Sequence, residues 1–190
     1  MRRHEQNPAF SSDGTKIAFT KVVRDRISRQ FRDAGMWTIN ADGTGVRKLA
    51  DAGDTPSWSP SGTRIVFSNH RDIFTIRPDG TGLRRLTAFG GGPNWSPDCA
   101  RILFGYYDRR TDRITFYTVN TADGTLALIH SGWFLGGGTF SPDGTKITYS
   151  GYEGSVSGQH VLSLNADGSG TPTPLTSSSE TNVYLDWGPA

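Results

Sequence analysis

Residues 56–67 read PSWSPSGTRIVF, and three other stretches of the chain repeat this pattern. The copies read PAFSSDGTKIAF at 8–19, PNWSPDCARILF at 93–104 and GTFSPDGTKITY at 138–149, and a fifth, truncated copy reads LDWGP at 185–189. Successive aromatic anchors are separated by 48, 37, 45 and 47 residues, and they are Phe10, Trp58, Trp95, Phe140 and Trp187. Steps of this length are typical of one four-stranded β-propeller blade.

Each repeat has a second half in which β-branched and aromatic residues alternate before a turn. The four copies read MWTINADG at 36–43, IFTIRPDG at 73–80, FYTVNTADG at 116–124 and HVLSLNADG at 160–168. Glycine accepts the positive φ of hairpin turns, so Asp-Gly predicts a strand entering a hairpin. We therefore expect an all-β propeller of four-stranded antiparallel blades. Its repeats are expected at about 7–50, 55–87, 92–130 and 137–176, with a partial repeat at 183–190.

Composition limits the partners and the chemistry of this chain, whose 190 residues are expected to form a single propeller domain, 1–190. The 20 Lys and Arg residues nearly cancel the 18 Asp and Glu residues, so we expect neither nucleic acid nor a membrane as a partner. The only cysteine, Cys99, excludes an intrachain disulfide and a multi-cysteine metal site. No signal peptide is recognisable, and the compartment stays open.

Two repeats depart from the pattern. Cys99 and Ala100 stand where other repeats carry Gly-Thr, so this turn either takes another type or holds a non-glycine residue in strained geometry. In the fourth repeat Gly138 replaces the proline and Phe140 the tryptophan. These changes affect single blades and leave the predicted architecture unchanged. Residues 21–34 lack helix caps and lie between two predicted strands, so we expect an extended hairpin loop there.

The two repeated halves resemble the WD-like blade of the TolB-like β-propellers of bacteria. The resemblance covers about residues 7–190 and is specific for the fold. Similar blades serve as a protein-docking ring, as gating propellers of prolyl-oligopeptidase-type enzymes, and in some polysaccharide lyases, so the resemblance does not select one function. It implies a periplasmic or extracellular location.

The number of repeats raises the question of ring closure. Four repeats are followed by a single extra strand at 184–187, whereas TolB-like rings have about six blades. Four hypotheses are compatible with this count. Upstream blades could complete the ring, or copies of the chain could associate to complete it. Alternatively, an open arc could persist with its end covered, or a four-bladed ring could form while the last strand pairs elsewhere.

Candidate binding residues lie in the long loops, which fall on the propeller face opposite the Asp-Gly turns. Loops on a rigid scaffold are where binding sites are usually built. A basic loop and a second basic and aromatic loop could bind an acidic peptide, a phosphate or an anionic sugar, or could be solvated and paired with neighbouring carboxylates. The apolar 130–138 loop could form a contact patch or fill the wedge between two blades. The candidates are Arg24, Arg26, Arg29, Arg32, His70, Arg71, Tyr106, Tyr107, Arg109, Arg110, His130, Trp133 and Phe134.

Catalytic groups are not apparent in the sequence. The four histidines share no metal-ligand spacing, and no nucleophile-elbow motif is present, so we expect no catalytic residue, metal or cofactor. The predicted function is a non-catalytic interaction module that docks a protein or peptide at the loop-rich face. One alternative is a propeller part of a lyase-like or peptidase-like enzyme that binds an anionic carbohydrate or peptide. A second is a self-associating half-propeller, a homo-oligomer with a mainly structural role.

Overall fold

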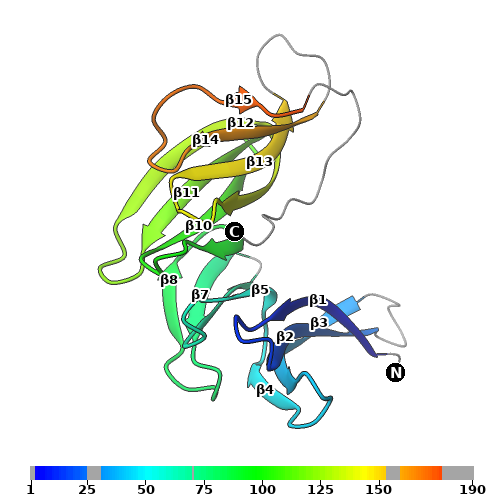
Figure 1. Cartoon of the computed structure of the whole chain (residues 1–190). Coiled ribbons are helices and arrows are strands. Elements are labelled where there is room, and N and C mark those ends of the chain that lie inside the picture. Colours follow the sequence, from blue (N-terminus) through cyan, green and yellow to red (C-terminus); the bar gives the residue numbers. More distant parts are fainter. Residues whose placement is uncertain (1–2, 25–30, 70, 153–158, 177–190) are drawn as a thin grey trace. The chain divides into compact units, whose positions relative to one another are not determined.

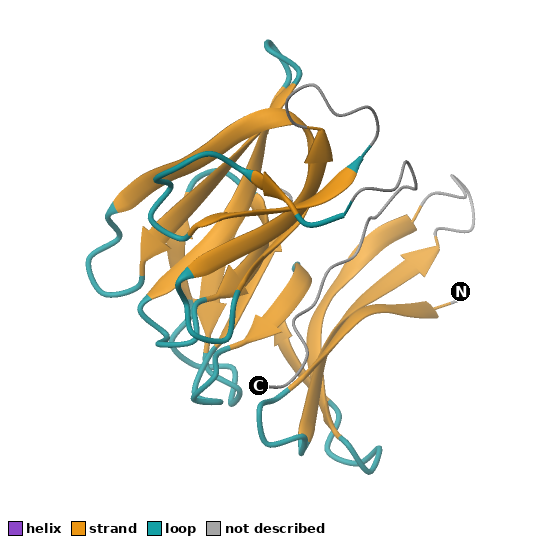
Figure 2. Cartoon of the chain, turned by 45° about the horizontal axis from the view of Figure 1, so that its top comes forward, coloured by secondary structure: helices purple, strands orange, loops and turns teal. Residues whose placement is uncertain are grey.

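The computed structural model of the chain describes residues 3–24, 31–69, 71–152 and 159–176 (Figure 1). Every regular element among them is a β-strand (Figure 2). The described residues accordingly include no helix of the length and apolar character needed to cross a membrane. The chain divides into two compact units, Met1–Pro93 and Asn94–Ala190.

The first unit consists of two four-stranded antiparallel sheets in which the strands follow sequence order. One sheet contains β1 (Arg3–Phe10), β2 (Lys16–Arg24), β3 (Phe31–Asn40) and β4 (Arg47–Ala50). The other contains β5 (Asp54–Trp58), β6 (Ile65–Asn69), β7 (Asp72–Ile76) and β8 (Arg84–Thr87). Each sheet is one repeat, as the sequence pattern predicts.

The second unit is built on one seven-stranded antiparallel sheet, which begins with β9 (Gly91–Trp95) just before the unit boundary. It continues through β10 (Arg101–Asp108), β11 (Arg113–Asn120), β12 (Leu126–Phe140), β13 (Lys146–Tyr152), β14 (His160–Asn165) and β15 (Thr173–Pro174). The third and fourth repeats share β12, which ends one repeat and begins the next. The predicted partial repeat at 183–190 lies outside the described residues.

The shared strand β12 corrects the prediction of an irregular loop at 129–137. Its first part pairs with β11 and its second part with β13. Register shifts between Trp133 and Gly136, and between Gly136 and Thr139, allow one strand to pass between two partners. Two other predicted loops are also shorter, because β2 and β3 extend into residues 21–34, and β10 and β11 extend into the second basic and aromatic loop.

The anchor aromatics follow the predicted pattern, with one exception. Trp58, Trp95 and Phe140 are buried, whereas Phe10 is 63% exposed at the same repeat position. In the first unit Trp58 packs in a core with Ala18, Met36 and other apolar side chains, and its Nε1 donates a hydrogen bond to the Ala9 carbonyl oxygen at 3.0 Å. The anchor therefore joins its own sheet to the sheet of the preceding repeat.

An aspartate closes the turn between the first two strands in the first, third and fourth repeats, whereas the second repeat carries Ser61 there. In the fourth repeat, Ser141 Oγ donates to Asp143 Oδ1 at 2.5 Å, and the backbone N of Thr145 donates to the same oxygen at 3.0 Å. The first and third repeats contain the same arrangement around Asp13 and Asp98. These carboxylates thus accept hydrogen bonds within their own turns.

These turns make stability depend on pH. Hydrogen bonds from Ser141 and Thr145 lower the pKa of Asp143 from 3.8 to about 2, and those from Ser11 and Thr15 do the same for Asp13. Because the folded-state pKa lies below the unfolded value, their stabilisation is present above pH 3.8 and is lost as the pH falls toward 2. We expect the melting temperature to fall across this window, and the fall to be shallower in Asp13→Asn/Asp143→Asn. An equally steep fall in that double variant would contradict this assignment.

Cys99 occupies the strained conformation that the sequence raised as one of two alternatives. Its φ is 60°, close to the 71° of Gly144, which stands at the same place in the fourth repeat. A side chain at positive φ costs about 1–3 kcal/mol, a cost that glycine avoids. We expect Cys99→Gly to raise the free energy of unfolding by about 1 kcal/mol and Gly144→Ala to lower it by a similar amount, in urea denaturation. A loss of stability in Cys99→Gly would show that the thiol makes a compensating contact.

Candidate functional site

Large aromatic side chains are exposed at one end of the strands of the second unit. Trp133 is 47% exposed, Tyr152 44% and Tyr106 38%. Trp133 on β12 and Tyr152 on β13 are direct cross-strand partners. We call the group formed by Tyr106, Arg113, Trp133 and Tyr152 the Arg113–Trp133 surface.

The strand register places these side chains on one face of the sheet. Tyr106 pairs with Thr115, and Thr115 pairs with Ser131, whose Oγ accepts a hydrogen bond from Thr115 Oγ1 at 3.0 Å. Successive side chains of a strand point to opposite faces, so residues two apart share a face. Arg113 therefore lies on the face of Thr115, and Trp133 on the face of Ser131.

Arg113 links the aromatic residues to the backbone of β12. Its guanidinium carbon lies 5.7 Å from the centroid of the Trp133 ring, within the range of a cation–π interaction. Its Nη2 donates a hydrogen bond to the Ser131 carbonyl oxygen at 2.8 Å. Its Nε is buried and has no hydrogen-bond acceptor among the described residues. An unsatisfied buried donor costs about 1–3 kcal/mol, so holding Arg113 in this position has a cost in stability.

Three of the predicted residues lie at the end of β10 and in the β10–β11 turn. Arg109 and Arg110 are exposed, and Tyr107 is 51% exposed. Tyr107 lies on the face opposite Tyr106, and its hydroxyl donates to Asp112 Oδ1 at 2.5 Å. This hydrogen bond raises the pKa of Tyr107 above its usual value of 10.0. Tyr107 is therefore a protonated donor at neutral pH that already has an acceptor.

The predicted loop at 130–138 is part of a strand whose register shifts between Trp133 and Gly136. Trp133, before the shift, is exposed, whereas Leu135, within it, is buried in the core with Phe116, Tyr149 and other apolar residues. His130 lies on the face opposite Ser131, is half-buried and has its ring centroid 5.5 Å from that of Tyr149. His130 therefore does not lie with Trp133. Phe134 belongs to β12, but its side chain is outside the description.

The basic candidates between β2 and β3 belong to the first unit. Arg24 ends β2 and pairs with Phe31, and Arg32 pairs with Val23. The side chains of Arg24 and Arg32 are outside the description, and Arg26, Arg29 and His70 lie outside the described residues. Arg71 is exposed at the end of the β6–β7 turn. Of this basic region the structure describes Lys21, whose Nζ lies 4.1 Å from the Trp37 ring centroid.

The structure adds Tyr152 to the candidate residues and gives a position to Arg113, which the sequence places in the second basic and aromatic loop. Arg113 belongs to a basic run that the sequence does show, but only the fold places it over Trp133. Tyr152 carries a weak signal in the sequence, since it follows the strand aromatic Tyr149 by three residues, as Tyr107 follows Phe104. The described residues include no group of three or more His, Cys, Asp or Glu side chains that could hold a metal ion.

Comparisons with known proteins support the fold. No protein-family profile matches the sequence, and no curated protein is similar to it in sequence. Among solved structures, TolB from Acinetobacter baumannii is 21% identical with a TM-score of 0.69, and the match covers 91% of this chain and 43% of that one. An oligogalacturonate lyase in complex with manganese is 13% identical with a TM-score of 0.70, covering 92% of this chain and 54% of the lyase.

A third similar structure is the acylaminoacyl peptidase of Pyrococcus horikoshii, 15% identical with a TM-score of 0.69, where the match covers 92% of this chain and 33% of the peptidase. The chain thus spans between a third and about half of these three proteins. At such identities the likeness shows the fold alone. The chain is all-β, is built of four-stranded antiparallel repeats, and shares the β-propeller fold of TolB, the lyase and the peptidase.

Proposed function

We propose that the chain is a non-catalytic binding module that docks a protein or peptide segment bearing a carboxylate on the Arg113–Trp133 surface. The observation that carries the proposal is the exposed Trp133 ring with a guanidinium within cation–π distance and Tyr152 opposite it in the sheet. Tryptophan, tyrosine and arginine are the residues that dominate the binding energy of protein interfaces.

The chemistry of the surface favours an acidic group beside an apolar one. The aromatic rings supply apolar area at low cost in conformational entropy, because each side chain has two rotatable bonds. The Arg113 guanidinium lies beside Trp133 and is permanently charged, so a carboxylate of the docked segment would form a charge-assisted ion pair with it. A segment with one Asp or Glu next to an apolar or aromatic residue satisfies both requirements.

Binding of synthetic peptides by isothermal titration calorimetry tests the proposal. The probes are a library of peptides with one Glu or Asp flanked by Leu, Phe or Trp, and the same peptides with Gln or Asn in its place. We expect Trp133→Ala and Arg113→Gln each to weaken the best peptide about tenfold or more, and the amide peptides to bind the original chain correspondingly less. Leu126→Ala is the matched control, since Leu126 is 44% exposed on β12 and lies outside this surface.

Two results would overturn the proposal. One is peptide affinity that is the same in Trp133→Ala, Arg113→Gln and the original chain, while circular dichroism shows all of them folded. The other is turnover of oligogalacturonate or of peptide substrates by the chain, which would favour the alternative of an enzyme part. The peptide titrations and the turnover assays use the same preparations, so the two functions are separated directly.

A further inference from the structure

The first unit contains a junction between two repeats that shows what each face of a repeat packs against. We call the face that carries the anchor aromatic the anchor face and the opposite one the back face. Trp58 and Phe67, on the anchor face of the second repeat, share a core with Ala18, Met36 and Leu49 on the back face of the first. Leu49 is 9% exposed in this junction.

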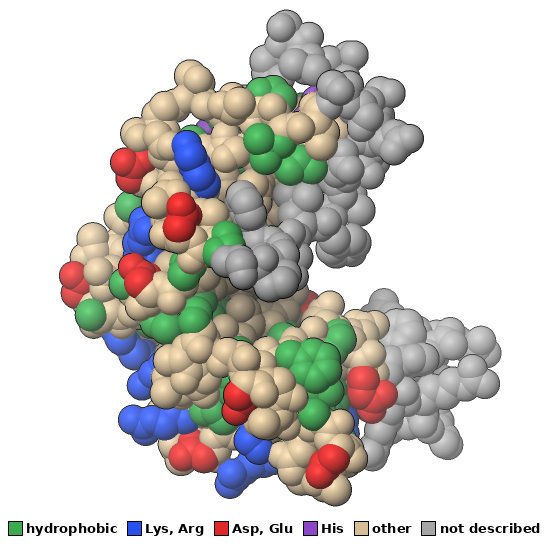
Figure 3. Space-filling view, viewed as in Figure 1, with side chains coloured by type: hydrophobic (Ala, Val, Ile, Leu, Met, Phe, Trp, Pro, Cys, Tyr) green, Lys and Arg blue, Asp and Glu red, His purple; other side chains and the backbone are tan. Residues whose placement is uncertain are grey.

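The anchor face of the first repeat carries the same kinds of residue and is exposed at its Phe10 end, although Phe19 on the same face is 7% exposed. Phe10 pairs with Ile17 across β1 and β2, and Ile17 pairs with Ile39 across β2 and β3, so the three form one apolar row. Phe10 is 63% exposed, whereas Trp58 at the same position is 8% exposed. In the space-filling view, hydrophobic side chains reach the surface of the face shown (Figure 3). This apolar row has the same composition as the row that packs in the junction between the first two repeats, but Phe10 at its end is exposed.

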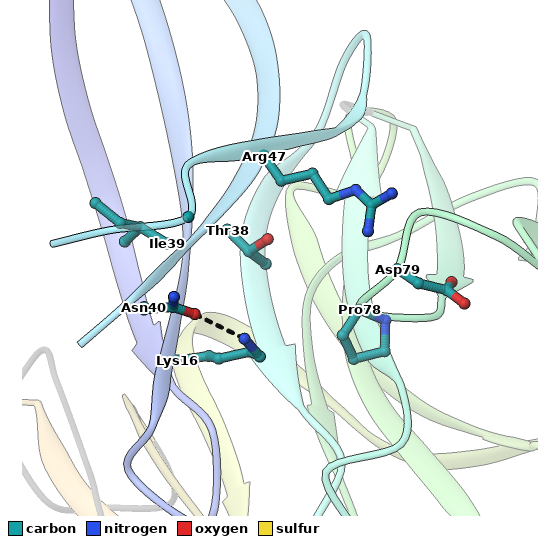
Figure 4. A pocket seen from close by; sticks show the side chains of 8 residues that line it. Lys16, Thr38, Ile39, Asn40, Arg47, Pro78 and Asp79 are labelled. Atoms are coloured by element: carbon teal, nitrogen blue, oxygen red, sulfur yellow. Dashed lines mark hydrogen bonds between the residues drawn. The ribbon is translucent and has the colours of Figure 1, made fainter. Parts of the chain in front are cut away.

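A second feature of the junction is a pocket that faces the turn between the third and fourth strands of the next repeat. It has a volume of about 390 Å³ and is lined by Lys16, Asn40 and Arg47 of the first repeat and by Pro78 and Asp79 of the second, among others (Figure 4). Lys16 Nζ donates a hydrogen bond to Asn40 Oδ1 at 2.7 Å. The Pro78–Asp79 turn thus lies against the back face of the preceding repeat.

The fourth repeat has the same pocket without such a turn. This pocket, about 350 Å³ in volume, is lined by Lys146, Asn165, Thr173 and Leu175 together with other residues, all from the fourth repeat. Lys146 Nζ donates to Asn165 Oδ1 at 2.7 Å, as the equivalent Lys16 does to Asn40. Leu175, the counterpart of Leu49, is 55% exposed.

We propose that the first repeat of one copy of the chain packs its anchor face on the back face of the fourth repeat of a second copy. In this contact Phe10 lies beside Leu175, and the turn at Asp42 lines the pocket of the fourth repeat together with Lys146, as the Pro78–Asp79 turn lines its own pocket together with Lys16. Asp42 and Lys146 have opposite charges. We infer that a whole repeat occupies this face, because the equivalent pocket of the first repeat is lined by a turn between the third and fourth strands of its neighbour. The single strand predicted at 184–187 includes no such turn. The contact is head-to-tail, so each copy uses two different surfaces.

Single variants of each surface test this arrangement. Light scattering after size exclusion, from about 1 to 100 µM, should give masses above 20.7 kDa that fall toward this value on dilution. Phe10→Asp and Leu175→Asp should each weaken self-association at least about thirtyfold. Leu83→Asp is the matched control and should leave it unchanged, since Leu83 is 56% exposed and lies on neither surface.

Mixing the two variants supplies the decisive result. A Phe10→Asp copy keeps an intact fourth repeat, and a Leu175→Asp copy keeps an intact first repeat, so the mixture should form a dimer that neither variant forms alone. A mass of 20.7 kDa at every concentration overturns the proposal and leaves Phe10 to another occupant. A mixture that stays monomeric, while the unmutated chain associates, overturns the head-to-tail contact. Neither surface includes Trp133, so these outcomes are independent of peptide binding.

Discussion

Replacing Trp58 with alanine is expected to lower the free energy of unfolding of the first unit by about 3–5 kcal/mol, in line with other buried aromatic residues. The side chain is 8% exposed and packs with Met36, Ile65 and Phe67 in the core between two repeats. Its removal also leaves the Ala9 carbonyl oxygen without the Nε1 donor at 3.0 Å. Because total stability is about 5–15 kcal/mol, this variant should melt at a much lower temperature.

Phe10→Ala is the matched comparison, since Phe10 holds the same position in the first repeat but is 63% exposed. Little apolar surface is lost there, and we expect a cost below about 1 kcal/mol in dilute solution. Urea denaturation followed by far-UV circular dichroism measures both variants. Equal losses of unfolding free energy in Phe10→Ala and Trp58→Ala would contradict the conclusion that the anchor residue stabilises the fold by packing against the preceding repeat.

Restoring proline at Gly138 is expected to destabilise the second unit by about 3 kcal/mol, although Pro8, Pro56 and Pro93 stand at this position in the other repeats. A Cβ added at Gly138 would lie 3.0 Å from Leu103 Cδ2 and 3.2 Å from the Phe116 ring. Leu103 and Phe116 are buried in the core and have little room to move. In addition, Gly137 has a φ of 44°, which a following proline disfavours.

Gly138→Ala separates the two causes, because it adds the Cβ without the proline ring. We expect it to cost about 1–2 kcal/mol in the same urea denaturation. Gly91→Ala is the control: an added Cβ there meets no heavy atom within 4 Å, so its stability should be unchanged or slightly raised. If Gly138→Pro raised the free energy of unfolding, Leu103 and Phe116 would have made room for the proline. The repeat pattern would then predict stability at this position better than the contact distances do.

Local patterns in the sequence predicted the repeats because each repeat specifies its own strands and turns. In β14 the buried residues His160, Leu162 and Leu164 alternate with half-buried ones, as the period of two requires. The Asp-Gly turns form with the aspartate accepting hydrogen bonds from residues two positions away. Such interactions span few residues, so they can be recognised without knowledge of the fold.

The candidate site combines residues that the sequence singles out with residues that come together only across strands. Trp133 and Tyr106 are aromatic residues in a predicted loop face, and their exposure agrees with a binding role. The cation–π contact of Arg113 with Trp133 and the pairing of Trp133 with Tyr152 depend on the registers of β11, β12 and β13. A shift of one residue in any register would move these side chains to opposite faces.

The sequence by itself determined an all-β chain of four-stranded repeats, because a period of 37 to 48 residues with fixed turn residues is a local property of the chain. Only the tertiary structure decided which equivalent residues are buried. Phe10 and Trp58 share one sequence pattern, as do Leu49 and Leu175, yet one of each pair is buried and the other exposed. The reason is that burial depends on the neighbouring repeat that covers a face, and a repeat's own residues do not specify that neighbour.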